Sequence, residues 1–569
     1  MSRQDTLLSE ARRAATQPDG IFARLRVFSN DIIFVHLESE QVSWKNCQIS
    51  AELEAEGLRG ALESAFRVKF SEPIQTKTIF FDSFEWGIWF GEQLLFQAGG
   101  QLQLCGRDHD WIGDLQQSFP TSAKHVPHFA REFPRGPFRA ELERLIGARS
   151  LQSVARLSMR EQGVELFNQA QKTVFRFDLT DLFATENAPT PFYRLCHFQP
   201  LKGYEAEAAK AIKLLQTLGA REISEGPLAL FLRESGSVPR RYTLRPTFDL
   251  TPELTIRETA RRIIQKILAI ARENERGICQ DIDTEFLHDY RICMRKIRSI
   301  LSLIPGIYPK EKMTELKAQF ANYCEATNSL RDLDVYLLAR EQYTEMLPGA
   351  LRPPLEQVFH DFAKARRRAL RRVTNHLGSP QYQTSIEAME RFFAALADLP
   401  ETNVSKDPAG PLIAKCIYKR YRRIVKIERS LGADTPDAVL HEVRIHCKKL
   451  RYLIEFFSEL LPSGETDRIE KQLRRLQTCL GLFNDCSVQQ RALFDYWKGK
   501  RKQAGHHEDL ALSIGGLVAL LNDGQQQERG RFHDILDDFC SPQILRAMKA
   551  VCLDSSGFPV SPAPRSSAG

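Results

Sequence analysis

The sequence predicts an α+β chain in which an antiparallel, β-rich N-terminal domain precedes an all-α domain. Three observations support this prediction. Short β-branched and aromatic runs broken by turns fill residues 23–180, helical periodicity dominates residues 251–550, and a basic helical motif occurs twice in the second half. The length of 569 residues is enough for two to four domains.

The first half contains six runs that read as strands, at residues 31–36, 76–81, 93–96, 102–105, 164–167 and 174–177. Residues 174–179 alternate between apolar and polar side chains, which is typical of a strand buried on one face. Residues 51–66 and 204–218 instead repeat apolar residues at intervals of three and four, which predicts helices. We therefore expect a closed or nearly closed antiparallel sheet with helical interludes.

The second half reads as a series of helices. Thr251-Pro252-Glu253 is a favourable helix start, because Thr can cap backbone N–H groups and Pro fits the first turn. Prolines then mark the expected helix ends, at Pro305, Pro309, Pro353, Pro380, Pro400, Pro411, Pro436 and Pro462. The expected organisation is an extension (1–22), an α+β domain (23–245), a helical domain (250–553, with halves at about 250–400 and 405–553) and a disordered tail (554–569).

Charge is unevenly distributed along the chain. Residues 1–250 hold 30 Lys and Arg against 31 Asp and Glu, whereas the whole chain has a net charge of +7, so the excess of positive charge lies in the second half. The twelve cysteines form no Cys-x-x-Cys pair, and we predict reduced thiols with no metal or cofactor. Without a signal sequence or an apolar run of membrane-spanning length, we expect a cytoplasmic protein.

The basic motif occurs at residues 287–298 as LHDYRICMRKIR and at residues 440–451 as LHEVRIHCKKLR. The two histidines are separated by 441 − 288 = 153 residues. Downstream, Asp332 and Asp485 lie in a second pair of similar segments at the same offset, since 485 − 332 = 153. Two matches at one offset indicate a duplicated helical unit.

This spacing places the cations of each copy on one stripe of a helix. At 100° per residue, positions 288, 291, 295 and 298 fall within roughly an 80° arc. Like charges at such spacings repel each other, so stripes without acids favour a bound polyanion, although acids from elsewhere in the fold could also pair with them. The residues expected to bind the anion are His288, Arg291, Arg295, Lys296, Arg298, Lys364, Arg368, Arg371, Lys415, Lys419, Arg422, Lys426, His441, Arg444, Lys448, Lys449 and Arg451.

The histidines and aspartates of the repeat have more than one interpretation. His288 and His441 could donate to phosphate or form hydrogen bonds between packed helices, and no metal-ligand spacing around them repeats in both copies. Asp332 and Asp485 are expected to orient basic side chains or to cap a helix, and not to act in catalysis.

These motifs resemble the CHAD family, the conserved histidine α-helical domain. The matching segments are Leu287-His288-x-x-Arg291-x-x-x-Arg295-Lys296-x-Arg298, Leu330-Arg331-Asp332-Leu333-Asp334-Val335, Leu440-His441-x-x-Arg444-x-x-x-Lys448-Lys449-x-Arg451-Tyr452 and Leu480-Gly481-x-x-Asn484-Asp485. The resemblance implies two pseudo-symmetric four-helix bundles with a basic groove that holds inorganic polyphosphate. It also implies a non-catalytic binding module, often found at polyphosphate granules.

The first half resembles a degenerate CYTH domain, a triphosphate tunnel fold, at Lys77-Thr78-Ile79-Phe80-Phe81-Asp82-Ser83 and at Arg194-Leu195-Cys196-His197-Phe198 followed by Pro200-Leu201-Lys202-Gly203. Active members carry Glu-x-Glu-x-Lys, whose period of two aims all three side chains into the tunnel. The nearest segments here, Glu38-Ser39-Glu40 and Glu52-Leu53-Glu54, lack the Lys. We therefore expect no enzymatic activity.

Two other functions remain as alternatives. One is a metal-dependent triphosphatase or polyphosphatase in the N-terminal domain. The other is nucleic-acid binding, since a cationic groove attracts any phosphate backbone. Few aromatic residues accompany the basic stripes, with Tyr418, Tyr421 and Tyr452 as the candidates for stacking on bases, so nucleic acid is not the expected partner.

Overall fold

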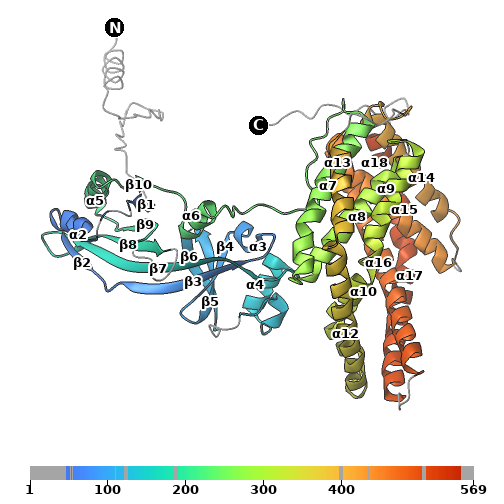
Figure 1. Cartoon of the computed structure of the whole chain (residues 1–569), viewed down its shortest axis with the longest axis horizontal. Coiled ribbons are helices and arrows are strands. Elements are labelled where there is room, and N and C mark those ends of the chain that lie inside the picture. The colour runs from blue at the N-terminus through green and yellow to red at the C-terminus, as the bar shows by residue number, and fades with distance from the viewer. Residues whose placement is uncertain are drawn as a thin grey trace, which may run out of the picture. The chain divides into compact units, whose positions relative to one another are not determined.

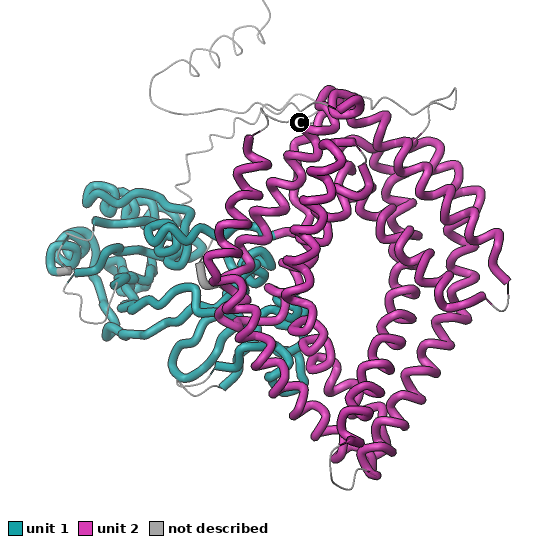
Figure 2. The backbone as a smooth tube through the Cα atoms, turned by 45° about the vertical axis from the view of Figure 1, so that its right-hand side comes forward, with its two compact units in different colours: residues 1–242 teal, residues 243–569 magenta. Residues whose placement is uncertain are grey.

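The structure is a computed structural model. It describes residues 46–50, 53, 55–108, 111–120, 126–183, 190–304, 306–395, 402–432, 435–502 and 508–552. The chain divides into two compact units, Met1–Tyr242 (unit 1) and Thr243–Gly569 (unit 2), which are coloured separately in Figure 2. The predicted extension, the predicted tail and the strand expected at residues 31–36 lie outside the described residues.

Unit 1 is built on an antiparallel sheet (Figure 1), which confirms the predicted β-rich N-terminal half. Nine strands pair in the order β10-β1-β9-β8-β7-β3-β4-β5-β6, and β2 pairs with β7. The strands are β1 (Asn46–Ile49), β2 (Arg67–Phe70), β3 (Ile74–Asp82), β4 (Gln93–Ala98), β5 (Gln101–Asp108), β6 (Trp111–Pro120), β7 (Gln152–Phe167), β8 (Thr173–Phe183), β9 (Tyr193–Pro200) and β10 (Arg221–Glu222).

The described strands do not decide whether the sheet is closed or nearly closed, as expected from the sequence. Their pairing order has two ends, β10 and β6, and no pairing among the described residues joins them. Strand alternation does place the predicted side chains in the core, where Phe175 and Phe177 are buried and Arg176 is exposed. Two helices, α2 (Ala55–Glu63) and α5 (Glu205–Thr217), contribute Leu58 and Leu215 to the same core.

The described part of unit 1 also has the helices α3 (Gly87–Phe90), α4 (Pro137–Ile146) and α6 (Pro227–Glu234) and a 3-10 turn at Ala130–Glu132. Asp82, which ends β3, fixes the start of α3 because its carboxylate accepts hydrogen bonds from the backbone N–H groups of Ser83, Ile88 and Trp89. Burial raises the pKa of Asp82 to about 6, against the opposing effect of these bonds. Asp82 therefore has a clear structural role in joining a strand to a helix.

Unit 2 is helical, as predicted, and its helices fall into two halves. The first half comprises α7 (Ile256–Cys279), α8 (Thr284–Leu303), α9 (Lys310–Glu325), α10 (Asn328–Leu338), α11 (Arg340–Met346), α12 (Arg352–Leu377) and α13 (Pro380–Ala394). The second comprises α14 (Ala409–Glu428), α15 (Asp437–Phe456), α16 (Ser463–Lys500), α17 (Glu508–Cys540) and α18 (Pro542–Cys552). No helix among the described residues is long and apolar enough to cross a membrane.

The helix starts follow the duplication. The first three helices of the halves begin 409 − 256, 437 − 284 and 463 − 310 residues apart, and each difference is 153. Of the prolines predicted to end helices, Pro305 and Pro400 lie outside the described residues. The others stand at helix starts: Pro309, Pro436 and Pro462 directly precede helices, Pro380 opens α13, and Pro353 and Pro411 lie in the first turns of α12 and α14. Proline suits the first turn because its missing N–H would have no partner there.

The predicted start of the first helix at Thr251 was wrong. Helix α7 begins at Ile256, and the side chain of Thr255 caps it by accepting a hydrogen bond from the N–H of Glu258. The residues before Thr255 form a turn, in which the N–H of Leu254 donates to the carbonyl of Thr251 at 3.2 Å. The second half pairs with this turn, because the N–H of Ala409 donates to the carbonyl of Leu254.

This pairing marks a pseudo-twofold axis between the halves. Thr255 and Pro408 form an antiparallel bridge, and they are equivalent residues, since 408 − 255 = 153. The N–H of Ile256 donates to the carbonyl of Asp407 at 2.9 Å, and the N–H of Ala409 donates to that of Leu254 at 3.2 Å, again between equivalent pairs. Equivalent helices also pack on each other, namely α7 on α14, α8 on α15 and α12 on α17.

Candidate functional site

Helices α8 and α15 bring the two copies of the basic motif together. Asp283 caps α8 by accepting from the N–H groups of Glu285 and Phe286. Each helix buries one apolar face, including Tyr290 and Ile297 on α8 and Leu450 on α15. The basic stripe lies beside that face, so packing of the apolar faces determines where the cations point.

The cations of the two repeats meet in one group, which we call the central cluster. Burial lowers the pKa of Arg291, Arg444 and Lys448, and the charge of Arg295 lowers each of them further. Arg295 is therefore near cations of its own repeat and of the other repeat. The central cluster consists of Arg291, Arg295, Arg331, Arg444, Lys448 and Arg451.

The pKa of Lys448 reflects both its burial and the nearby cations of the central cluster. Its pKa falls to about 8, first because of burial and then because of the charges of Arg444, Arg295 and Arg451. Asp485 opposes this effect without cancelling it. A lysine with so low a pKa is poorly compensated by the protein, and an anion bound beside it would favour its charged form.

Several donors in the central cluster are buried without an acceptor. Among the described residues, this holds for the Nε atoms of Arg444 and Arg451 and for one terminal nitrogen of Arg331. An unsatisfied buried donor costs about 1–3 kcal/mol, and more when it is charged. Such donors are suited to the oxygens of a phosphate group, which arginine can bind through two parallel hydrogen bonds.

Asp332 and Asp485, the two acids of the motif, lie beside these cations. Burial raises the pKa of Asp332, and the nearby Arg291 and Arg331 oppose that shift. Asp485 has the matching position in the second repeat, since its charge raises the pKa of both Arg444 and Lys448. Each acid can therefore orient the cations of its own repeat.

Arg291 is also tied to the backbone where α9 ends and α10 begins. Its guanidinium donates to the carbonyl of Cys324 and to the hydroxyl of Thr327, both at 2.7 Å. This leaves Arg291 more firmly positioned than Arg295, which donates to the carbonyl of Arg291 at 3.3 Å.

Not every predicted residue joins the central cluster, and Lys296 lies elsewhere. It is 4% exposed, donates to the carbonyl of Leu244 at 2.6 Å and forms an ion pair with Glu455 of α15. Lys296 thus links the two repeats and the segment that enters unit 2. Its pairing with a buried acid argues against the predicted role of Lys296 in the anion site.

The remaining predicted cations lie on more exposed surfaces. Arg298 and Arg371 are exposed, as are the predicted residues of α14. Lys449 lies on the side of α15 that faces α14, where burial and then the charge of Arg420 lower its pKa. The exposed set on α14 is Lys415, Lys419, Arg422 and Lys426.

Two of the predicted residues of α12, Lys364 and Arg368, line a cavity of about 700 Å³. Asp332 of the motif also lines it, and Tyr496 and Lys500 come from the other repeat. The two residues from α16 are already engaged, since both contact the carboxylate of Asp361 at 2.8 Å. Lys364 and Arg368 of α12 therefore line the same cavity as Asp332 of the motif.

The structure adds basic residues that sequence reasoning missed. Arg331 belongs to the second motif, and its position next to Asp332 was the available signal. Arg420 contacts the Nδ1 atom of His446 at 2.9 Å, and Arg423 pairs with Glu442 at 2.9 Å. These last two contacts hold α14 against α15 and lie outside the central cluster.

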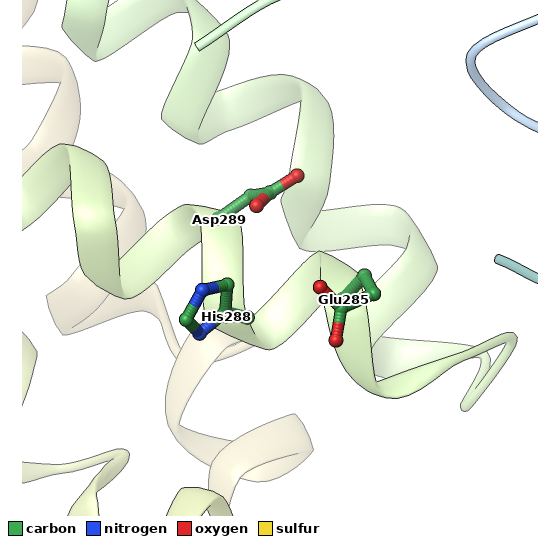
Figure 3. A group of neighbouring side chains, drawn as sticks. All are labelled: Glu285, His288 and Asp289. Carbon is green, nitrogen blue, oxygen red and sulfur yellow. The ribbon is translucent and has the colours of Figure 1, made fainter. Parts of the chain in front are cut away.

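His288 has acidic neighbours, which the sequence analysis did not expect. Figure 3 shows it on α8 with Glu285 and Asp289, and one potential ligand atom of each lies within 4.8 Å of the others. Two carboxylates and an imidazole could hold a metal ion. In the second repeat the equivalent positions are Ala438, His441 and Glu442, so the group is not duplicated.

The fold and site together define unit 2 as a duplicated helical module with a basic centre. Residues 262–493 match the family model of the CHAD domain, and unit 2 therefore carries a CHAD domain. No curated protein sequence matches the chain.

Three solved structures that are similar to the chain share less than 25% identity with it. The CHAD domain from the plant Ricinus communis shares 22% identity over 52% of this chain and 95% of its own, with a TM-score of 0.43. PptA from Streptomyces chartreusis shares 16% identity over 50% and 99%, with a TM-score of 0.38. A putative adenylyl cyclase from Hippeastrum, HpAC1, with a dominant triphosphatase activity, shares 12% over 34% and 95%, with a TM-score of 0.24.

Proposed function

We propose that this protein binds inorganic polyphosphate through the central cluster of unit 2. The observation that carries the proposal is the meeting of Arg295, Arg444 and Lys448 from two repeats, with buried guanidinium donors that lack acceptors among the described residues. A linear polyphosphate offers closely spaced phosphate oxygens to such donors. As part of this proposal, the protein resides at polyphosphate granules.

The proposed role is binding without cleavage. In unit 1, a cavity of about 270 Å³ is lined by Glu56 and Asp181 together with three arginines. Arg194 donates to Asp181 at 2.6 Å, and Arg160 pairs with the same carboxylate. Since Asp181 is neutralised by two arginines, it is poorly suited to hold the divalent cation that phosphohydrolysis of this kind requires.

The packing of the tyrosines favours polyphosphate over nucleic acid. Tyr421 is 0% exposed and Tyr452 is 8% exposed, and Tyr418 is only partly exposed. Two of the three rings considered for stacking are thus part of the helical core and are not available to bases.

The decisive test is a calorimetric titration of the full chain with long-chain polyphosphate and with orthophosphate at physiological salt. The wild type should bind the long chain far more tightly. Arg295→Glu with Lys448→Glu should weaken that binding by about a hundredfold or more, since at least two charge-assisted contacts are reversed.

A control variant makes the same change of charge elsewhere on unit 2. Arg474→Glu with Lys498→Glu alters two side chains of α16 that are 67% and 54% exposed. Its affinity should stay close to that of the wild type. Equal weakening by both variants, with circular dichroism unchanged, would contradict a site at the central cluster, and equal affinity for orthophosphate and the long chain would contradict the proposed function.

A further inference from the structure

A small cavity lies between α15 and α16 in the second repeat. Its volume is about 200 Å³, below the ~300–1,000 Å³ of pockets that enclose drug-sized ligands. It is therefore suited to a single small group. The lining residues that matter here are Ala438, His441, Arg444, Asn484 and Ser487.

Two positions at which the repeats carry different residues account for the space in this cavity. Asn484 corresponds to Arg331, and Ala438 corresponds to Glu285, both at the offset of 153. In the first repeat, Arg331 is more than half buried and lies near the charges of Glu285 and Asp289. The second repeat replaces the long, oppositely charged pair with two shorter, uncharged side chains, which leaves space beside Arg444.

The chemistry of the cavity suits an anion. The Nε atom of Arg444 is buried without a hydrogen-bond partner among the described residues, and His441 is exposed beside it. Asn484 and Ser487 add uncharged donors. The one acid of the lining, Asp437, is engaged by Arg529, so its negative charge is compensated.

The inner wall is apolar and closed to solvent. Leu440, Leu480 and Phe483 line the cavity and are at most 6% exposed. This apolar wall leaves room for a phosphate group at the end of a chain. A polyphosphate chain that passed through the cavity would need a second opening. The cavity thus favours the end of a chain over its middle.

We propose that this cavity binds the terminal phosphate group of polyphosphate, an inference that rests on the proposed function. An internal unit carries one negative charge, whereas a terminal phosphate has a second ionisation near pH 6 and approaches two charges at neutral pH. Arg444 belongs both to the cavity and to the central cluster. A chain anchored by its end at Arg444 therefore continues directly to Lys448 and Arg295.

The test compares one size fraction of polyphosphate in two forms, with free ends and with both ends converted to alkyl esters. Titrated into the full-length wild type, the free-ended form should bind about ten- to a hundredfold more tightly, the range expected for one lost charge-assisted hydrogen bond. Asn484→Arg, which introduces the residue of the first repeat, should fill the cavity and abolish this difference between the two forms.

Two further variants guard against misfolding as an explanation. Ser487→Asp introduces the carboxylate that the first repeat has at Asp334, and it should also abolish the preference for free ends. Thr478→Arg adds the same charge as Asn484→Arg at an exposed position of α16 and should keep the preference.

The outcomes separate the two proposals. Equal binding of both forms by the wild type, or a preference that survives Asn484→Arg and Ser487→Asp, overturns the end pocket and leaves polyphosphate binding intact. Failure of the wild type to bind either form overturns both.

Discussion

Arg295 and Lys448 occupy equivalent positions in the two repeats, since 448 − 295 = 153, and they lie close enough for their charges to interact across the pseudo-twofold axis. Burial is the main reason that the pKa of Lys448 falls to about 8, and the charges of Arg444 and Arg295 lower it further. A symmetric protein that brings equivalent cations together repels itself at its centre, and a bound polyanion relieves that repulsion.

The low pKa of Lys448 predicts that polyphosphate affinity depends on pH. The free protein loses the Lys448 proton above about pH 8, whereas a bound polyanion stabilises the charged form and raises its pKa. Binding therefore takes up a proton near pH 8, and affinity should fall by up to tenfold per pH unit above it. Calorimetry from pH 7 to 9.5, in buffers of different ionisation enthalpy, measures both the affinity and the number of protons taken up on binding.

Lys448→Arg is the matched control for this prediction, because arginine keeps its charge over the whole range. Its affinity should stay nearly constant up to pH 9.5, and its proton uptake near pH 8 should disappear. A wild-type profile that matches that of Lys448→Arg would show that Lys448 does not titrate in the site.

The ion pair between Lys296 and Glu455 should matter for stability and not for binding. Their side chains are 6% and 10% exposed, so Lys296→Met leaves the buried carboxylate of Glu455 with only the more distant Arg245, at 3.9 Å. Removal of one partner of such a pair costs about 3–5 kcal/mol. Denaturant unfolding should show this loss, and Lys296→Met with Glu455→Leu should recover much of it.

Lys449→Met provides the control, since Lys449 is the equivalent residue of the second repeat and has no ion pair among the described residues. It should unfold close to the wild type. Under conditions where Lys296→Met stays folded, its polyphosphate affinity should lie within about twofold of the wild-type value, and a much larger loss would return Lys296 to the anion site.

The contact between α7 and α8 depends on Gly277. A Cβ atom built at this position would lie 2.3 Å from the ring of Phe286. Alanine usually stabilises a helix interior by roughly 0.5–1 kcal/mol relative to glycine. Here the clash should dominate, and Gly277→Ala should destabilise the protein by about 1–3 kcal/mol. Thermal unfolding followed by circular dichroism measures the change.

Gly464→Ala is the matched control, for which we expect no loss of stability. Gly464 lies in the first turn of α16, and nothing is within 4 Å of an added Cβ atom. This substitution should be neutral or slightly stabilising. If both alanine variants stabilised the protein, close packing of Gly277 against Phe286 would be excluded.

Much of the architecture was predictable because local periodicity specifies it. The alternation around Phe175 and Phe177 identified a strand, and the spacing of His288, Arg291 and Arg295 identified a helix with one basic stripe. The duplication was visible as a constant offset of 153 residues, and the helix starts repeat that offset.

The structure departs from the local sequence patterns where distant parts of the chain meet. The helix start expected at Thr251 gave way to Ile256, because Leu254 pairs with Ala409 of the other repeat. Lys296 looked like its neighbours in the motif, but its direction on α8 brings it to Glu455. Neither partner is near in sequence, so local periodicity carries no information about them.

By itself, the sequence determined that the protein has a β-rich half, a duplicated helical half and basic stripes on helices, since each of these follows from residue spacing along the chain. Only the tertiary structure decided which cations share a site. Burial and mutual repulsion depend on distances between helices α8, α10, α15 and α16, and packing across the pseudo-twofold axis sets those distances. For that reason Arg331 joins the central cluster and Lys296 does not.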